Sequence, residues 1–496
     1  MLTMTSYTVM QFVDSLMVAQ VGPRELAAAG NGGIWAFTPI AAAMGVLTVV
    51  NTYVSQNYGA GTPEKGPRYA WAAMWLSLIL WVFIMAPFAI ALPFFFSRLG
   101  HSEELQALES GYAQILLAGS LFLLMGRGLH HYFFGLHRPK VVAVAAVTGN
   151  IVNVVANYVL IFGEQGLPAL GLPGVPGMPA LGVYGAAMGT VMGSAVELAI
   201  PAFIFLGPRM HAELRSRSDW RLQFGPIKDL LRIGWPAAVQ FGNEVMCWAI
   251  FMSVLVGRFG ETHMTAGWAA LRYMHLSFMP AVGFAVAATS LVGKYIGAGD
   301  HRTGAARARL ALVMSITYMT ICAIVFVVYR HELIGWFVES RATDPETVAE
   351  MIRIGGYLMI CAAVFQTADA FGIVYTGALR GAGDTVWPGI VTIIYSWVFI
   401  VLGGWLLTRA FPHWESVGPW IGAAAYIIIY GVTMALRFES GRWKSIQLLT
   451  PTPEETLERE AALVAPLLPG PPAPSAEGTT RDLAEEVPEA HDGTRP

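Results

Sequence analysis

Long apolar runs, each wide enough to cross a lipid bilayer, follow one another along most of the chain. A membrane-spanning helix needs about 20 predominantly apolar residues. Short polar or glycine-rich segments separate the runs. The pattern predicts twelve transmembrane helices, over residues 1–21, 27–57, 69–96, 109–136, 140–163, 181–206, 228–257, 264–296, 306–329, 349–379, 386–409 and 417–437.

Composition supports an integral membrane protein. Of the 496 residues, 55% are hydrophobic and only 13% are charged, whereas soluble domains carry about 25% charged residues. The three cysteines all lie inside apolar runs, with the spacing of neither a disulfide framework nor a metal site. We therefore expect an all-α membrane fold in which the cysteines serve helix packing.

Two halves of the sequence repeat one another. VSQNYGAG at 54–61 matches VGKYIGAG at 292–299, and WAFTPIAAAMG at 35–45 resembles LSFMPAVGFAV at 276–286. Such a repeat indicates duplicated architecture. Because each half has an even number of helices, both enter the membrane in the same sense, around an axis along the membrane normal. The predicted organisation is a first six-helix bundle at 1–206, a cytoplasmic linker at 207–227, a second six-helix bundle at 228–445 and a disordered tail at 446–496.

Basic residues are unevenly distributed among the predicted loops. Loops that follow even-numbered helices carry most of the lysines and arginines, including Lys65, Arg68, Arg138 and Arg302. Positively charged loops face the cytoplasm. The bias therefore predicts that both termini are cytoplasmic. The acidic, proline-rich and aromatic-free composition of the tail predicts that it does not fold.

Three carboxylates interrupt the apolar runs: Asp14, Glu244 and Asp369. A charge near the membrane midplane costs about 2.5–3.5 kcal/mol on insertion scales. A chain tolerates this cost when the group is paired, faces water or binds a cation. Asp14 has so few residues before it that it is expected near the external end of its helix, unless the first helix begins upstream of residue 1.

Glu244 and Asp369 could together hold a small cation. Na⁺ prefers oxygen ligands, by the logic that governs Ca²⁺ and Mg²⁺, and two carboxylates with a few amide or carbonyl oxygens supply them. A buried carboxyl group also accepts a proton readily. Both ions therefore stay open as candidates for this site.

Amides accompany the carboxylates. Asn153 and Asn157 share one face of their helix, while Gln11 and Gln240 stand one turn before the first two carboxylates. These four side chains could line a cavity or supply hydrogen bonds to the ion site. Ordinary hydrogen bonding between helices, worth about 0.6 kcal/mol per bond, is an equal alternative.

Other charges lie within the predicted helices. Arg127 and Arg272 each need a partner in the membrane, and Glu197 is a fourth intramembrane acid. Arg272 could neutralise Glu244 or Asp369, in which case an anionic or zwitterionic substrate becomes possible. Structural pairing is the alternative for both arginines.

Four motifs stand out along the chain: FVDSLMVAQVG at 12–22, GNIVNVVANYVLIFG at 149–163, GWPAAVQFGNEVMCW at 234–248 and FQTADAFGIVYTGALRGAGDT at 365–385. They resemble motifs of the multidrug and toxic compound extrusion (MATE) family, and within it the bacterial NorM branch. The resemblance covers about residues 1–440, and the motifs occur in order with the appropriate number of helices between them.

The resemblance implies an antiporter of twelve helices in two bundles, which exchanges inward Na⁺ or H⁺ for outward amphipathic, often cationic, compounds. By motif, Asp14, Glu244 and Asp369 match the family's acids of helices 1, 7 and 10. Phe365 stands where the branch commonly has tyrosine, which removes one oxygen donor. Asn157 stands where some relatives carry aspartate, which removes a charge from the site in the first half.

The resemblance also implies a bacterial inner-membrane protein that needs no cofactor, binds no nucleic acid and can work as a monomer. A lipid-linked sugar or lipid flippase of the same superfamily is the alternative function. An enzyme is not expected, although GAGD occurs at 297–300 and 381–384, because both copies read as glycine-rich turns at helix ends. A passive channel would give no reason for acids in both halves.

Overall fold

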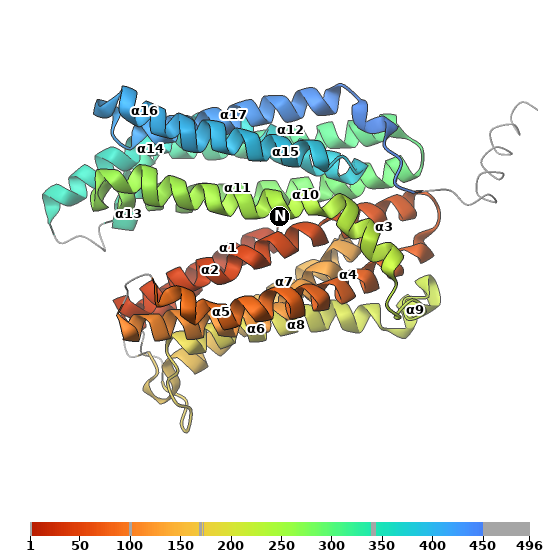
Figure 1. Cartoon of the computed structure of the whole chain (residues 1–496), viewed down its shortest axis with the longest axis horizontal. Helices are drawn as coiled ribbons and strands as arrows, with labels where there is room; N and C mark the ends of the chain where they lie inside the picture. Colours follow the sequence, from red (N-terminus) through yellow and green to blue (C-terminus); the bar gives the residue numbers. More distant parts are fainter. Residues whose placement is uncertain (1, 99–101, 168–170, 172, 339–343, 450–496) are drawn as a thin grey trace, which may run out of the picture. The chain divides into compact units, whose positions relative to one another are not determined.

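The computed structural model describes residues 2–98, 102–167, 171, 173–338 and 344–449. These residues form an all-α protein (Figure 1), as predicted. The helices of the first half are α1 (Leu2–Val21), α2 (Pro23–Leu47), α3 (Val49–Gly59), α4 (Pro67–Leu80), α5 (Ala86–Phe96), α6 (Glu103–Gly135), α7 (Pro139–Phe162) and α8 (Val183–Phe205). A short helix, α9 (Pro208–Leu214), follows in the predicted linker.

The second half repeats this arrangement with longer helices. Its elements are α10 (Phe224–Ile250), α11 (Glu261–Gly297), α12 (His301–Val328), α13 (Arg330–Val338), α14 (Pro345–Ala382), α15 (Val386–Tyr395), α16 (Gly404–Ala410) and α17 (Val417–Glu439). Within the described residues, eleven helical segments are long and apolar enough to cross a membrane. They correspond to the second through twelfth predicted helices. The predicted first helix is α1, which is helical over 20 residues but carries polar side chains along much of its length.

Several membrane helices change geometry partway. The second predicted helix is interrupted at Thr48, which separates α2 from α3. Three others contain π-helical segments, at Trp81–Met85, Phe251–Val256 and Ser396–Gly403. Such segments inside α-helices often occur at functional sites. The last of them lies against α10, the helix that carries Glu244.

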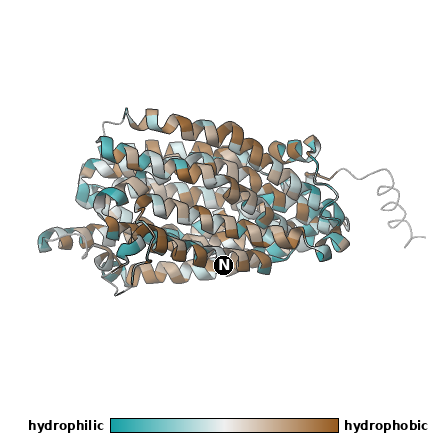
Figure 2. Ribbon diagram, turned by 90° about the horizontal axis from the view of Figure 1, so that it is seen from below, coloured by the Kyte–Doolittle hydropathy of each residue, from teal (hydrophilic) through white to brown (hydrophobic). Residues whose placement is uncertain are grey.

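Each half has its own hydrophobic core. In the first half α6 packs against α2 and α8, and α7 packs against α8. In the second half α14 packs against α11, α12 and α17. Ile227, Leu230 and Ile233 of α10 belong to the first core, so the second half begins against the first. Figure 2 shows apolar residues along the middle of the helices and polar residues concentrated at their ends.

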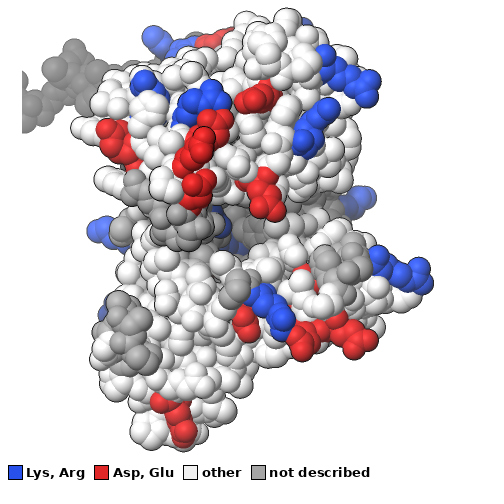
Figure 3. Space-filling view, turned by 90° about the vertical axis from the view of Figure 1, so that its left-hand side faces the viewer, with Lys and Arg blue, Asp and Glu red and all other residues white. Residues whose placement is uncertain are grey.

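The two halves meet closely at the end that carries α3 (Figure 1). Thr52 Oγ1 donates to the carbonyl of Arg380 at 2.8 Å, and Gln56 Nε2 donates to the carbonyl of Gly381 at 2.9 Å. A Cβ atom at Gly59 would overlap the carbonyl oxygen of Lys294 on α11. Glycine is therefore required there for the backbones to approach. At the opposite end, Figure 3 shows a hollow between the halves.

The chain continues beyond α17 back toward the first half. Leu448 and Leu449 pack against the first core, and a Cβ atom at Gly383 would overlap the Leu448 side chain. Residues 446–449, at the start of the predicted tail, thus contact both halves. The remainder of that predicted tail lies outside the described residues.

Candidate acidic sites within the membrane

Glu244 and Asp369 lie together in the second half. Glu244 is on α10 and Asp369 is near the middle of α14, and each is half-buried. The two carboxyl groups interact electrostatically, and Glu244 also interacts with Arg380. Three charged groups from two helices thus share one region. Glu244 and Asp369 can carry two negative charges and Arg380 carries one positive charge, so one further cation would neutralise the group.

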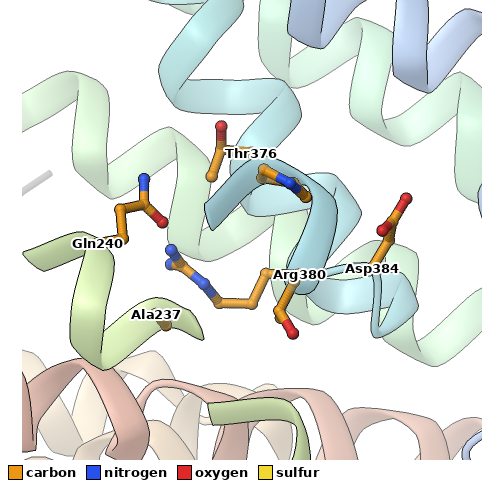
Figure 4. Close-up of a pocket in the computed structure, with 7 residues that line it drawn as sticks. Ala237, Gln240, Thr376, Arg380 and Asp384 are labelled. Atoms are coloured by element: carbon orange, nitrogen blue, oxygen red, sulfur yellow. The ribbon is translucent and has the colours of Figure 1, made fainter. Parts of the chain in front are cut away.

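Arg380 lies on α14 about three helical turns after Asp369 and therefore on the same helix face. Figure 4 shows its guanidinium group beside Gln240 of α10, with Asp384 on the other side of the arginine. The pocket around it is lined by Ala237, Gln240, Thr376, Arg380, Asp384, Thr385 and Pro388. This role could not be predicted from the sequence, because the helix predicted over 349–379 ends just before Arg380. The observed helix α14 extends to Ala382 and so includes Arg380.

Two tyrosines of α17 complete this region. Tyr430 shares a hydrogen bond with Thr376 at 2.7 Å and accepts one from Gln240 Nε2 at 3.5 Å. Tyr426 interacts electrostatically with both Glu244 and Asp369. The tyrosine hydroxyl groups supply polar atoms beside the carboxylates. No sequence signal distinguished these residues from the many other aromatic residues of the chain.

A hydrogen-bonded clamp fixes α10 next to Glu244. Asn243 Nδ2 donates to Ser396 Oγ at 2.8 Å, and Trp397 Nε1 donates to Asn243 Oδ1 at 2.9 Å. Ser396 and Trp397 begin the π-helical segment Ser396–Gly403. The irregular turn therefore presents two side chains to one amide, which holds the neighbouring carboxylate in place.

Phe365 and Arg272 were both predicted near this site. Phe365 is fully buried in the hydrophobic core of the second half. Arg272 is an exposed residue of α11 and interacts electrostatically with His275. Arg380 interacts electrostatically with Glu244.

Asp14 forms a second polar cluster in the first half. Asn157 Nδ2 donates to Asp14 Oδ1 at 2.6 Å and lies 3.5 Å from Asn153 Oδ1. Asn153 Nδ2 lies 3.5 Å from Thr190 Oγ1 of α8. The cluster thus gathers carboxylate, amide and hydroxyl oxygens from α1, α7 and α8. Gln11, one turn before Asp14, is exposed.

The structure pairs several of the remaining intramembrane and helix-end charges. Arg127 Nη1 lies 4.0 Å from Glu197 Oε1. Asp384 accepts a hydrogen bond from Arg437 Nε at 2.8 Å, and Asp300 caps α12 by accepting from the backbone N–H of Thr303 at 2.9 Å. The aspartates of the two GAGD segments are therefore an ion-pair partner and a helix cap. Neither arrangement resembles a pair of catalytic aspartates.

The duplicated bundle of membrane helices, with polar sites inside each half, defines a membrane transporter. The chain belongs to the MatE family, whose sequence model matches residues 1–159 and 236–406. It is 28% identical over 439 residues to the multidrug resistance protein NorM of Burkholderia vietnamiensis, covering 87% of this chain and 90% of that protein. It is 30% identical to a probable NorM of Rhizobium meliloti (strain 1021), covering 82% and 84%.

Solved structures agree on the fold. A MATE transporter crystallised in complex with MaL6 superimposes with a TM-score of 0.79 at 22% identity, covering 90% of this chain and 95% of that chain. An outward-facing multidrug resistance MATE transporter of the MOP superfamily gives 0.78 at 23% identity, covering 90% and 94%. The NorM relatives are multidrug transporters, not enzymes, and they indicate a bacterial inner-membrane protein.

Proposed function

We propose that the protein is a secondary active antiporter that exports amphipathic, cationic drugs or metabolites in exchange for inward Na⁺ or H⁺. The observation that carries this proposal is the electrostatic interaction of Glu244 with both Asp369 and Arg380 within the helical bundle of the second half. The Asp14 cluster is a further cation-coupling site in the first half. Gln240 and Tyr430 support the main site, and Asn153 and Asn157 support Asp14.

The exchange follows from charge balance. When no other cation is bound, Arg380 compensates one of the two carboxylates, and the second attracts an ion. Na⁺ or H⁺ and a cationic substrate compete for this position, so loading one displaces the other. One elementary charge that moves inward through 100 mV gains about 2.3 kcal/mol. This energy supports roughly fiftyfold accumulation of substrate outside, since 1.4 kcal/mol corresponds to a factor of ten.

The hollow is proposed to open to the outside of the cell. The positive-inside bias supports a cytoplasmic position for the α3 end and, as predicted from the sequence, for both chain termini. The hollow at the opposite end then opens outward, and the exchange proceeds by alternating access as the halves close one end and open the other. Because one chain supplies both bundles, the protein is expected to work as a monomer.

Transport in proteoliposomes tests the proposal. Substrate export is measured under an imposed Na⁺ gradient and, separately, under an imposed pH gradient. Asp369→Asn and Glu244→Gln are each expected to reduce exchange at least tenfold while the protein still inserts. Asp300→Asn is the matched control, because asparagine caps helices as well as aspartate does. Exchange that continues undiminished in both Asp369→Asn and Glu244→Gln would refute the site.

The guanidinium of Arg380 in the pocket favours a second candidate, a flippase for lipid-linked sugars or lipids. An anionic head group would bind Arg380 in place of a carboxylate. Movement of a fluorescent lipid-linked sugar between leaflets, without dependence on an ion gradient, would support this candidate. Its absence together with ion-driven export of organic cations would support the antiporter.

A further inference from the structure

A charged cluster lies inside the first half, apart from the Asp14 cluster. Arg127 and His130 come from α6, Glu197 comes from α8 and Tyr7 comes from α1. Glu197 Oε1 lies 3.4 Å from His130 Nδ1 and 4.0 Å from Arg127 Nη1. The Arg127 guanidinium also stacks over the Tyr7 ring, 4.3 Å from its centroid. Two basic side chains of α6 thus lie beside the Glu197 carboxyl group of α8, and Tyr7 of α1 packs against one of them.

The cluster is almost entirely removed from solvent. The exposed fraction of the side chain is 2% for His130, 9% for Glu197 and 17% for Arg127. Glu197 Oε1, both ring nitrogens of His130 and Arg127 Nε are buried without a hydrogen-bond partner among the described residues. An unsatisfied buried polar group costs about 1–3 kcal/mol, and more when charged. Each such group in a native structure needs a physical explanation.

Other polar groups lie near this cluster. His131 on α6 interacts electrostatically with His130, and Arg380 on α14 interacts electrostatically with His131. The Asn150 amide on α7 has a buried, unpartnered Nδ2 atom among the described residues, and a Cβ atom at Gly149 would contact Glu197. Within the described part of the chain, Glu197 is the acid that lies within 4.0 Å of both Arg127 and His130.

We propose that Glu197 and His130 form a proton-binding site in the first half, separate from the Asp14 cluster. A hydronium ion transfers its proton to Oε1 of the Glu197 carboxylate: one O–H bond of hydronium breaks, one O–H bond to Oε1 forms, and a water molecule is released. The protonated Oε1 then donates a hydrogen bond to Nδ1 of neutral His130. The proton resides on the carboxyl group rather than the imidazole, because this leaves Arg127 as the only charge of the buried trio, and each extra buried charge is costly. Arg127 is the most exposed member of the trio.

Proton binding at this site also acts on α1. Without the proton, Arg127 is held between the Glu197 carboxylate and the Tyr7 ring. With the proton, its attraction to Glu197 is lost and the contact with Tyr7 remains. Tyr7 and Asp14 are two turns apart on one face of α1. The site is thus positioned to link protonation to the helix that carries Asp14.

Infrared difference spectroscopy tests the proposal on the full-length protein in lipid. Spectra are compared between about pH 5 and about pH 8, the range in which histidine ordinarily titrates. A carboxylic acid band is expected at low pH, and Glu197→Gln should remove it. Glu109→Gln is the matched control, because Glu109 is another buried glutamate of α6, which accepts a hydrogen bond from Asn31 at 2.8 Å. This control should retain the band.

Variants of His130 test the hydrogen bond independently. His130→Phe should shift the band toward that of an acid without a hydrogen bond, and His130→Asn should restore it. The band should persist when Asp14→Asn, Glu244→Gln and Asp369→Asn are combined, so failure of the proposed antiport does not affect this test. If Glu197→Gln does not yield folded protein, the response of the band to the two His130 variants tests the proposed site on its own. A wild-type spectrum unchanged by Glu197→Gln, or a band indifferent to both His130 variants, would overturn the proposal.

Discussion

At the scale of single residues, a guanidinium beside a membrane carboxylate changes what that carboxylate can bind. Arg380 interacts electrostatically with Glu244 and packs over the Phe241 ring, with 5.9 Å between its Cζ atom and the ring centroid. In the proposed antiport, Arg380 is therefore an internal cation that competes with ions and substrate for Glu244.

Replacing this arginine should separate affinity from turnover. Arg380→Met is expected to tighten binding of a cationic substrate about tenfold, equivalent to 1.4 kcal/mol, because Glu244 loses its internal competitor. Turnover should fall, since a tightly held cation leaves slowly. KM and kcat for export in proteoliposomes measure the two effects. Arg302→Met, at an exposed position of α12, should change neither, and a raised KM in Arg380→Met would contradict the competition.

The Arg437–Asp384 pair predicts a stability effect. The two side chains are 16% and 5% exposed, and removing one partner of a buried pair costs about 3–5 kcal/mol. Arg437→Met should therefore lower the melting temperature of the detergent-solubilised protein strongly, and adding Asp384→Asn should restore part of it. Arg353→Met breaks an exposed pair with Glu350, worth about 0–1 kcal/mol. Equal decreases in melting temperature for Arg437→Met and Arg353→Met would show that burial of the Arg437–Asp384 pair has no effect on stability.

At the scale of helices, the contact of α3 with α11 depends on small side chains. Gly59→Ala would place a methyl group against the Lys294 carbonyl. Overpacking of this kind costs about 1–3 kcal/mol, and here it should push the two helices apart. Spin labels on α3 and α11 should show a longer separation by pulsed electron paramagnetic resonance. Gly30→Ala on α2, where a Cβ meets nothing within 4 Å, should leave the distance unchanged.

The length and position of the helices could be predicted from hydropathy because the membrane forces each spanning segment to be long and apolar. The acids stood out for the same reason, and Asp14, Glu244 and Asp369 are all half-buried within helices. The roles of Arg380, Tyr430 and Asn243 could not be predicted, because these residue types are common and their contacts depend on how helices pack. The π-helical segments likewise left no recognisable pattern, since their geometry arises from neighbouring helices.

At the scale of the whole molecule, an aromatic and cationic stack joins the halves at their closed end. His137, in the turn between α6 and α7, lies edge-on to Tyr58 of α3, with 5.3 Å between ring centroids. Lys294 of α11 lies over the same Tyr58 ring at 5.4 Å. Burial and the nearby Lys294 charge lower the pKa of His137 to about 4. The stack therefore forms with neutral His137. Protonation of His137 would weaken it, because a second positive charge would then lie near Lys294.

Acidification should weaken this end of the molecule. The unfolded histidine has a pKa of about 6.5, so between about pH 6.5 and about pH 4 the unfolded state binds more protons than the folded state. Stability from this group therefore falls as the pH falls. His137→Asn, which tolerates the positive φ of 57° at this position, should make the melting temperature less sensitive to acid. Exposed His413→Asn is the control, and identical pH profiles for His137→Asn and wild type would exclude the effect.

The segment that follows α17 contacts both halves of the molecule and so links them. Leu448 packs beside the turn at Gly383 in the second half. Leu448 and Leu449 also pack against the hydrophobic core of the first half. Separation of the two halves at the α3 end would break these leucine contacts. Truncation of the chain before Leu448 would remove these contacts and shift the conformational equilibrium of the transporter. Truncation after Leu449, or fusion of a reporter there, would leave the contacts intact.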